Sequence, residues 1–403
     1  MNMNNTVPNL FDLDGSGDPN VPYDILTTTV LKLLRSMPIN YVGNKKKLLE
    51  NILSVLHDNN IKYDTVFDAF CGSSVVSSVF RSMGKKVVAN DLLSFSSSGA
   101  VFYLMCDKIP LSRSAAIELT KDSGQAAPKF VQGRYEKFFT DDEARLLDVI
   151  RHNFLQSKMG RSGTFTGLGL DGSPKFVGGT GKDVSSPGDM LASAFFMHFV
   201  CNHVLHRCFS GGRYYSGQTL SRIDKRQQKT SKTIADDILA SLDENHHPGS
   251  SMIAHIGSMP TGTVYNCDIL KLLESGRVDA DLAYFDPPYG GDSSDYASLY
   301  RVCEEYIRGP SIDDLDGTKD AFRRFRDKKA YQSNFESMLD LCRKFPSWLI
   351  SFNESSFASI DDISAIIRRF RTKIDVRPVR YRYNYRKTGG GENKENEYLV
   401  LAR

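Results

Sequence analysis

Residues 279 to 290 combine an acid, two prolines and a tyrosine at the end of an apolar run. Residues 282–285 are apolar and end in aromatic side chains, which predicts a buried strand. The four residues that follow are Asp286, Pro287, Pro288 and Tyr289. Because two prolines cannot continue a strand ladder, the chain must leave the sheet there. Ligands of open α/β sheets bind outside the carboxyl ends of strands, so we expect a ligand at this tetrapeptide.

The groups of this tetrapeptide suit a planar amine. They are the carboxylate of Asp286, the carbonyl of Pro287 and the aromatic face of Tyr289. An exocyclic amino group on a base can donate one hydrogen to each acceptor while the base stacks on the tyrosine. Accepting both hydrogens returns electron density to a nitrogen whose lone pair is delocalised into the ring. The alternative is an aspartate before a rigid turn with a tyrosine packed nearby, which has no chemical role.

A strand, a glycine turn, a helix and a second strand precede this region. Residues 65–70 and 85–89 are the predicted strands, and the turn between them is Cys71-Gly72-Ser73-Ser74. Glycine lets the backbone approach a cofactor, and an acid about 20 residues further on can bind ribose hydroxyls. Asp91 follows the second strand, 23 positions after Asp68. Upstream, residues 38–47 place a glycine turn before a lysine-rich helix, which suits an anion or is simply a basic solvated turn.

Length and composition indicate a soluble globular protein. The chain has 403 residues, of which 40% are hydrophobic and 25% charged, and seven cysteines that suggest no disulfide framework. The net charge of +3 does not by itself argue for nucleic-acid binding. No apolar run approaches the roughly 18 residues of a membrane span, and the polar start is no signal peptide. We therefore expect a cytoplasmic protein with no membrane partner.

The middle of the chain has a different character. Residues 112–121 and 140–156 are predicted helices, and the glycine-rich tract 160–182 has no apolar period, which predicts a mobile loop. Residues 188–208 are a strongly apolar helix. It carries Cys201, His203, His206 and Cys208. Their spacing cannot aim four side chains at one point, so we favour core packing and expect no metal.

A basic segment follows this helix. Between residues 211 and 232 there are six basic side chains and one acid, Asp224. The predicted DNA-binding residues among them are Arg213, Arg222, Lys225, Arg226 and Lys229. Basic groups interleaved with aromatic residues suit phosphate contacts and groove recognition. A solvated helix face is the alternative.

Together these motifs resemble the N6-adenine-specific DNA methyltransferases of the Dam-like, alpha-ordered group. The order is a cofactor segment (38–47), a glycine loop (68–74), an intervening region and Asp-Pro-Pro-Tyr, whereas permuted groups place the catalytic motif first. The resemblance covers residues 36–108 and 262–403 and leaves the middle unmatched. Ser74 departs from the family pattern, since a second glycine is usual there.

The resemblance implies an α/β fold: a Rossmann-like methyltransferase sheet with a C-terminal antiparallel hairpin, plus a mostly helical inserted DNA-recognition domain. The hairpin is predicted at residues 376–387 and 397–402. Residues 1–22 are expected to be a disordered tail. The predicted catalytic domain combines residues 23–110 and 262–403, and the inserted target-recognition region is residues 111–261.

The resemblance also implies the reaction and its site. A methyl group would pass from S-adenosylmethionine to the N6 amino group of adenine in a specific double-stranded DNA sequence, after base flipping. The implied catalytic residues are Asp286, Pro287, Pro288 and Tyr289. The implied cofactor-binding residues are Tyr41, Gly43, Lys45, Asp68, Phe70, Cys71, Gly72, Ser73, Asp91 and Asp268. Asp268 would bind the amino group of the cofactor's adenine, and a cognate restriction endonuclease acting on the same site is a further expected partner.

Several other functions remain open. An N4-cytosine methyltransferase would use the same geometry but usually has serine in place of Asp286. A cytosine-C5 enzyme, the second class considered, is disfavoured because it needs a cysteine nucleophile, normally after proline, and the sequence has no Pro-Cys pair. An RNA or protein amine methyltransferase is a third possibility. A catalytically silent DNA-binding subunit is a fourth; the intact residues 286–289 argue against it and Ser74 argues for it.

Overall fold

The structure is a computed structural model that describes most of the chain from residue 41 onward. The described residues are 41, 43–135, 139–179, 186–210, 213, 214, 236, 257, 259–290, 296–309, 321, 324, 325, 327, 329–353, 356–382 and 394–403. The predicted tail and most of the basic segment therefore lie outside the described residues.

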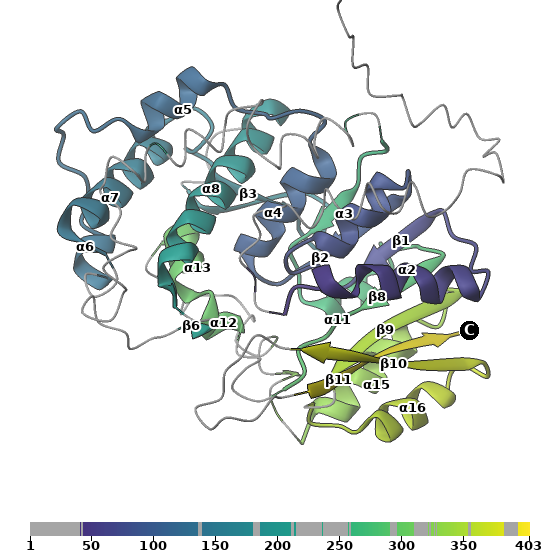
Figure 1. Cartoon of the computed structure of the whole chain (residues 1–403). Coiled ribbons are helices and arrows are strands. Elements are labelled where there is room, and N and C mark those ends of the chain that lie inside the picture. Colours follow the sequence, from purple (N-terminus) through teal and green to yellow (C-terminus); the bar gives the residue numbers. More distant parts are fainter. Residues whose placement is uncertain are drawn as a thin grey trace, which may run out of the picture.

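One large sheet organises the described part of the chain (Figure 1). Its strands are β1 (Thr65–Asp68), β2 (Lys86–Asn90), β3 (Gly163–Leu168), β4 (Pro174–Gly178), β7 (Thr263–Tyr265), β8 (Leu282–Phe285), β9 (Ser347–Asn353), β10 (Ile374–Arg382) and β11 (Lys394–Ala402). They lie in the order β10-β11-β9-β8-β1-β2-β7-β3-β4. Two further short strands, β5 (Phe209–Ser210) and β6 (Arg213–Tyr214), pair with each other.

The centre of the sheet is parallel and its two margins are antiparallel. β9, β8, β1, β2, β7 and β3 each run parallel to the next. β10 and β11 form an antiparallel hairpin that joins β9, and β4 turns back along β3. The mixed α/β architecture and the C-terminal hairpin agree with the predicted Rossmann-like methyltransferase sheet. The parallel strands bring their carboxyl ends to one edge of the sheet.

The central parallel strands β1, β2, β8 and β9 are almost entirely buried because each face of the sheet packs against helices. Val66 and Val87 enter one hydrophobic core, and their neighbours Phe67 and Val88 enter the other. The first core includes side chains of α2 (Leu49–Asp58), α3 (Val75–Ser82), α4 (Ser94–Met105), α5 (Arg113–Thr120), α6 (Val131–Arg134), α7 (Asp141–Gln156), α8 (Pro187–Cys208) and α13 (Arg301–Arg308). The second includes α11 (Ile269–Glu274), α15 (Tyr331–Leu341) and α16 (Ile360–Arg368). Two short helices, η1 (Lys46–Leu48) and α12 (Tyr296–Leu299), lie near the candidate active site.

The prediction of a mobile loop at residues 160–182 is wrong for its described part. β3 and β4 form a hairpin there, and Leu168 of β3 pairs with Tyr265 of β7. The glycines serve close packing rather than flexibility, because a Cβ at Gly163 would collide with the Val177 carbonyl and one at Gly178 with the Ile307 carbonyl. Part of the predicted insertion therefore extends the catalytic sheet.

Apart from the short strands β5 and β6, the elements in the remaining described part of residues 111–261 are helices. α5, α6 and α7 pack together beside α8 and α13. Whether residues 111–261 form a separate recognition domain stays a prediction. No helix among the described residues is both long enough and apolar enough to span a membrane.

Candidate active site

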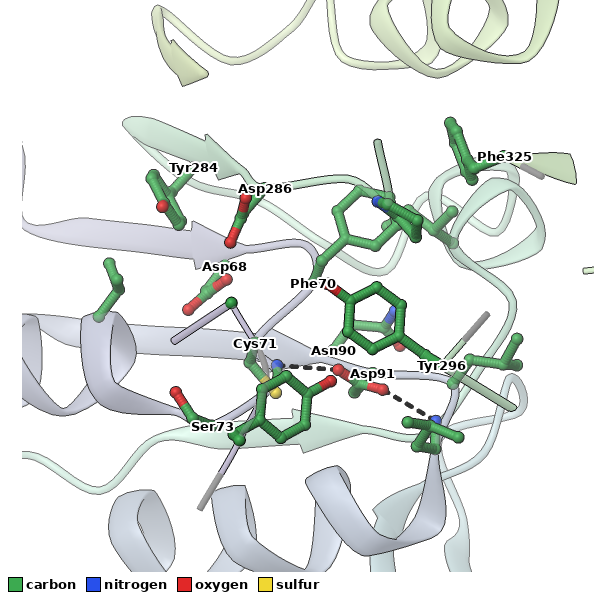
Figure 2. A pocket seen from close by; sticks show the side chains of 18 of the residues that line it. Asp68, Phe70, Cys71, Ser73, Asn90, Asp91, Tyr284, Asp286, Tyr296 and Phe325 are labelled. Carbon is green, nitrogen blue, oxygen red and sulfur yellow. Dashed lines mark hydrogen bonds between the residues drawn. The ribbon is translucent and has the colours of Figure 1, made fainter. Parts of the chain in front are cut away.

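Four acids follow neighbouring parallel strands at the carboxyl edge of the sheet. Asp68 ends β1, Asp91 comes directly after β2, Asp268 lies three residues beyond β7, and Asp286 follows β8. All four line one cavity of about 990 Å³, part of which is open to solvent. In Figure 2, Asp68 and Asp286 lie near each other, with Asp91 further along the cavity. The predicted gathering of acids at this edge is therefore present.

All ten predicted cofactor residues line this same cavity. They are Tyr41, Gly43, Lys45, Asp68, Phe70, Cys71, Gly72, Ser73, Asp91 and Asp268. Asp286 and Pro288 of the predicted catalytic tetrapeptide line it too. One cavity therefore joins the residues predicted to bind the cofactor to the predicted catalytic tetrapeptide.

The carboxylate of Asp286 binds two partners, one at each oxygen. Its Oδ2 lies 2.9 Å from the Nζ of Lys45, and its Oδ1 accepts a hydrogen bond of 2.6 Å from the hydroxyl of Tyr289. The Lys45 ammonium also donates to the Gly43 carbonyl at 3.1 Å and lies 5.1 Å from the centre of the Tyr289 ring. Lys45, predicted as a cofactor residue, is thus a partner of the predicted catalytic acid. Sequence reasoning missed this contact because the two residues are far apart in the chain.

The surroundings of Lys45 and Tyr289 keep both side chains protonated. Burial would lower the pKa of Lys45, but the carboxylates of Asp286 and Glu397 outweigh burial and raise it above its ordinary value. Burial raises the pKa of Tyr289 well above its usual range, and Asp286 and Glu397 raise it further. At neutral pH, Lys45 is therefore a cation and Tyr289 a hydroxyl donor.

The ring of Tyr289, predicted to stack on a base, is held from several sides. It meets Phe352 edge to face with 6.2 Å between ring centres, and its hydroxyl lies 3.4 Å from both Ser351 and Glu397. Stacking of a base on this ring stays a prediction. Glu397 was missed in the sequence because it begins an apolar stretch that predicted only a strand.

The glycine turn after β1 binds the acid after β2. The backbone N–H groups of Gly72 and Leu93 each donate to Asp91, at 2.8 Å in both cases (Figure 2). A Cβ at Gly72 would lie 2.9 Å from the Tyr41 ring, and the φ of Gly72 is +47°. Glycine is therefore required here. Burial raises the pKa of Asp91 to about 7, although the two N–H groups oppose this shift.

Asp68 keeps an oxygen available. Its Oδ2 accepts a 2.6 Å hydrogen bond from the Ser77 hydroxyl, whereas its buried Oδ1 has no hydrogen-bond partner among the described residues. Burial raises the pKa of Asp68 to about 7; Ser77 lowers it, and Asp286 and Asp91 raise it. A buried acceptor without a donor is costly, so this oxygen fits a donor group or a positive charge from a ligand.

Asp268 is engaged more fully than the sequence suggested. It caps α11 by accepting from the N–H groups of Leu270 at 2.9 Å and Lys271 at 3.4 Å. Its Oδ2 also pairs with the guanidinium of Arg324, at 3.1 to 3.2 Å. Arg324 lines the cavity and carried no recognisable signal in the sequence. Binding of an adenine amino group by Asp268 stays a prediction.

The predicted DNA-binding residues are not placed. The side chain of Arg213, on β6, and the whole of Arg222, Lys225, Arg226 and Lys229 lie outside the described residues. On α8, Cys201 is buried against Cys303 of α13, while the side chains of residues 203–208 are not described. In the part of the chain that the structure covers, no three His, Cys, Asp or Glu residues are grouped to hold a metal.

A glycine turn, an acid after the next strand and Asp-Pro-Pro-Tyr beside one cavity form the arrangement expected of a Rossmann-like methyltransferase. The family model of the D12 class N6 adenine-specific DNA methyltransferases matches residues 41–158, which is 50 residues beyond the predicted end at 108. Type II methyltransferase M2.HphI of Haemophilus parahaemolyticus is 23% identical over 369 residues, covering 90% of this chain and 96% of that protein. These comparisons confirm the predicted resemblance to the N6-adenine-specific DNA methyltransferases.

Proposed function

We propose that this protein transfers a methyl group from S-adenosylmethionine to the N6 amino group of adenine in a specific double-stranded DNA sequence, by base flipping. The observation that carries the proposal is the single cavity lined both by Asp91 and by Asp286. It lets a cofactor held by the glycine turn meet an amine held by the tetrapeptide.

The tetrapeptide would hold the amine in a reactive geometry. Asp286 and the carbonyl of Pro287 would each accept one amino hydrogen, which restores electron density at the nitrogen. Holding the nitrogen in line with the methyl group is a large part of the barrier reduction. A base must leave the duplex to reach this site, at a free-energy cost of a few kcal/mol. Stacking on Tyr289, at about 1–3 kcal/mol, would offset much of that cost.

The residues of the cavity fit S-adenosylmethionine. We propose that Asp91 binds the ribose hydroxyls, that Tyr41 and Gly43 line the methionine end, and that Asp268 binds the adenine. When bound, the cofactor supplies a methyl group on a positively charged sulfur. The carboxylates of Asp68 and Asp286 suit that charge, and the buried Oδ1 of Asp68 has acceptor capacity to offer.

The proposed macromolecular partner is double-stranded DNA. The basic segment 211–232 is the proposed reader of the target, through phosphate contacts and base edges. The relative from Haemophilus is named a type II methyltransferase. We infer from that name that a cognate restriction endonuclease acts on the same DNA site as this protein.

Expression in a host that lacks DNA methylation, followed by sequencing for methylated bases, tests this function. We expect N6-methyladenine at one short recurring sequence, and none with the Asp286→Ala variant. Asp279→Ala is the matched control, because Asp279 is an exposed acid just before the same strand. Methylated cytosine, or unchanged methylation with Asp286→Ala and normal cofactor affinity, would contradict the assignment.

A further inference from the structure

The Tyr289 hydroxyl lies between two carboxylates. It is 2.6 Å from Oδ1 of Asp286 and 3.4 Å from Oε2 of Glu397. A hydroxyl carries one hydrogen, so it donates to one carboxylate at a time. The shorter bond shows that Asp286 is the acceptor in this structure.

Glu397 is a buried acid on β11, and the apolar residues 399–402 follow it in the same strand. It lies on β11 opposite Asn353 of β9, is 1% exposed, and its Oε1 accepts a 3.3 Å hydrogen bond from the Asn353 amide. A buried carboxylate is costly unless hydrogen bonds and positive charge compensate it. Asn353, Tyr289 and the charge of Lys45 provide that compensation. An apolar residue at this position would avoid the free-energy cost of burying a carboxylate, which points to a role for the acid.

In the proposed reaction Asp286 must accept a hydrogen of the substrate amine, but its carboxylate already accepts hydrogen bonds. Both oxygens of Asp286 have donors, since Tyr289 binds Oδ1 and Lys45 binds Oδ2. A phenolic O–H prefers the plane of its ring and has two such orientations, half a turn apart. Turning the hydrogen therefore changes the acceptor without moving the Tyr289 ring, which Phe352 holds.

We propose that Glu397 is a positioning residue that accepts the Tyr289 hydroxyl when the substrate amine reaches Asp286, leaving Oδ1 free for an amino hydrogen. This inference rests on the proposed function, and it specifies how Oδ1 of Asp286 becomes free to accept a hydrogen of the amine. Glu397 touches neither substrate nor cofactor in this scheme. It acts only through Tyr289.

A double-mutant cycle between Glu397 and Tyr289 tests the proposal. The readout is the single-turnover rate of methyl transfer with saturating DNA and S-adenosylmethionine, measured separately from the affinities for each. Glu397→Gln removes the anionic acceptor, so the rate should fall about tenfold or more while cofactor affinity stays within about twofold. Tyr289→Phe removes the hydroxyl that occupies Asp286. In that background, Glu397→Gln should change the rate by less than about twofold.

Two further variants exclude simpler explanations. Ser351→Ala removes the other polar group at 3.4 Å from the hydroxyl and should leave the rate within about twofold. Glu397→Asp keeps the charge but moves it back by one methylene, so the rate should fall less than in Glu397→Gln. In the Tyr289→Phe background, Glu397→Asp should not lower the rate. This variant replaces Glu397→Gln in the test if Glu397→Gln does not fold.

The proposal is overturned if Glu397→Gln lowers the rate equally in the wild-type and Tyr289→Phe backgrounds, or if it leaves the rate unaffected. A fall in rate of more than tenfold in Tyr289→Phe alone also overturns it. A loss in Ser351→Ala equal to that in Glu397→Gln overturns it as well. If the wild-type protein methylates no adenine, the proposed function itself fails. An active wild type with an additive cycle rejects only the role of Glu397.

Discussion

Replacing Ser74 by glycine should stabilise the protein. Ser74 precedes α3 with a φ of +60°, in the left-handed region, and its side chain is fully buried. The cavity is lined by its neighbours Ser73 and Val75 rather than by Ser74. The departure from the family's glycine thus strains the turn but does not fill the site.

The size of the effect follows from two opposing terms. A left-handed conformation costs an L-residue about 1–2 kcal/mol, and glycine is free of this penalty. Glycine also loses more backbone entropy on folding, which costs about 0.5–1 kcal/mol. The difference between the two ranges is about 0 to 1.5 kcal/mol, so the net gain for Ser74→Gly should be about 0.75 kcal/mol. In a chain of this length, that gain should raise the melting temperature by about 1 °C.

Calorimetric or fluorescence melting without ligands measures this change. Ser73→Gly is the matched control, because Ser73 does not have a positive φ and should lose stability with glycine. Ser74→Ala removes a buried hydroxyl that has no hydrogen-bond partner among the described residues but keeps the Cβ and the backbone strain, so it should gain less than Ser74→Gly. A gain in Ser74→Ala equal to that in Ser74→Gly would show that the hydroxyl, and not the backbone, is at fault, and would refute the reasoning.

Four other predictions concern the ligands. Asp91→Ala should weaken S-adenosylmethionine binding by about 1.5–3 kcal/mol through lost ribose hydrogen bonds, and unchanged affinity in calorimetry would move the ribose site elsewhere. Because burial raises the pKa of Asp91 to about 7 and the ionised form is the acceptor, cofactor affinity should rise several-fold from pH 6 to pH 8; a flat profile would contradict this. Lys225→Ala or Lys229→Ala should weaken binding to all DNA and reduce the salt slope by about 0.9 each. Arg222→Ala or Arg226→Ala should instead lose about 1–3 kcal/mol of sequence discrimination, and a filter-binding series that showed neither effect would move recognition to another segment.

The sequence predicted most of the catalytic sheet because its strands are short, apolar and followed by acids. Strands were expected at residues 65–70, 85–89 and 282–285, and β1, β2 and β8 lie there, with Asp68, Asp91 and Asp286 at or just after their carboxyl ends. The prediction for residues 160–182 was wrong because their glycines were interpreted as a sign of flexibility. In β3 and β4 the glycines allow backbones to approach, and the apolar positions Phe165, Phe176 and Val177 were the usable signal.

The polar contacts of the site were beyond sequence reasoning. Lys45 and Asp286, or Tyr289 and Glu397, meet only because the sheet brings distant segments together. Spacing along the chain predicts which residues share a strand or a helix face, but it does not predict pairs between strands whose order is unknown. Arg324 was unpredictable for the same reason, since its partner Asp268 is 56 positions away.

The contact between Lys45 and Asp286 makes the two ligands thermodynamically linked. Lys45 lines the cavity beside the predicted cofactor residues, yet its ammonium binds the acid predicted to hold the amine. A ligand at either end that shifts this lysine changes the free energy of binding at the other end. Coupling of this kind is reciprocal, so the factor by which cofactor alters the affinity for DNA must equal the factor by which DNA alters the affinity for cofactor. We therefore expect the affinity for the spent cofactor and the affinity for the methylated DNA to depend on each other.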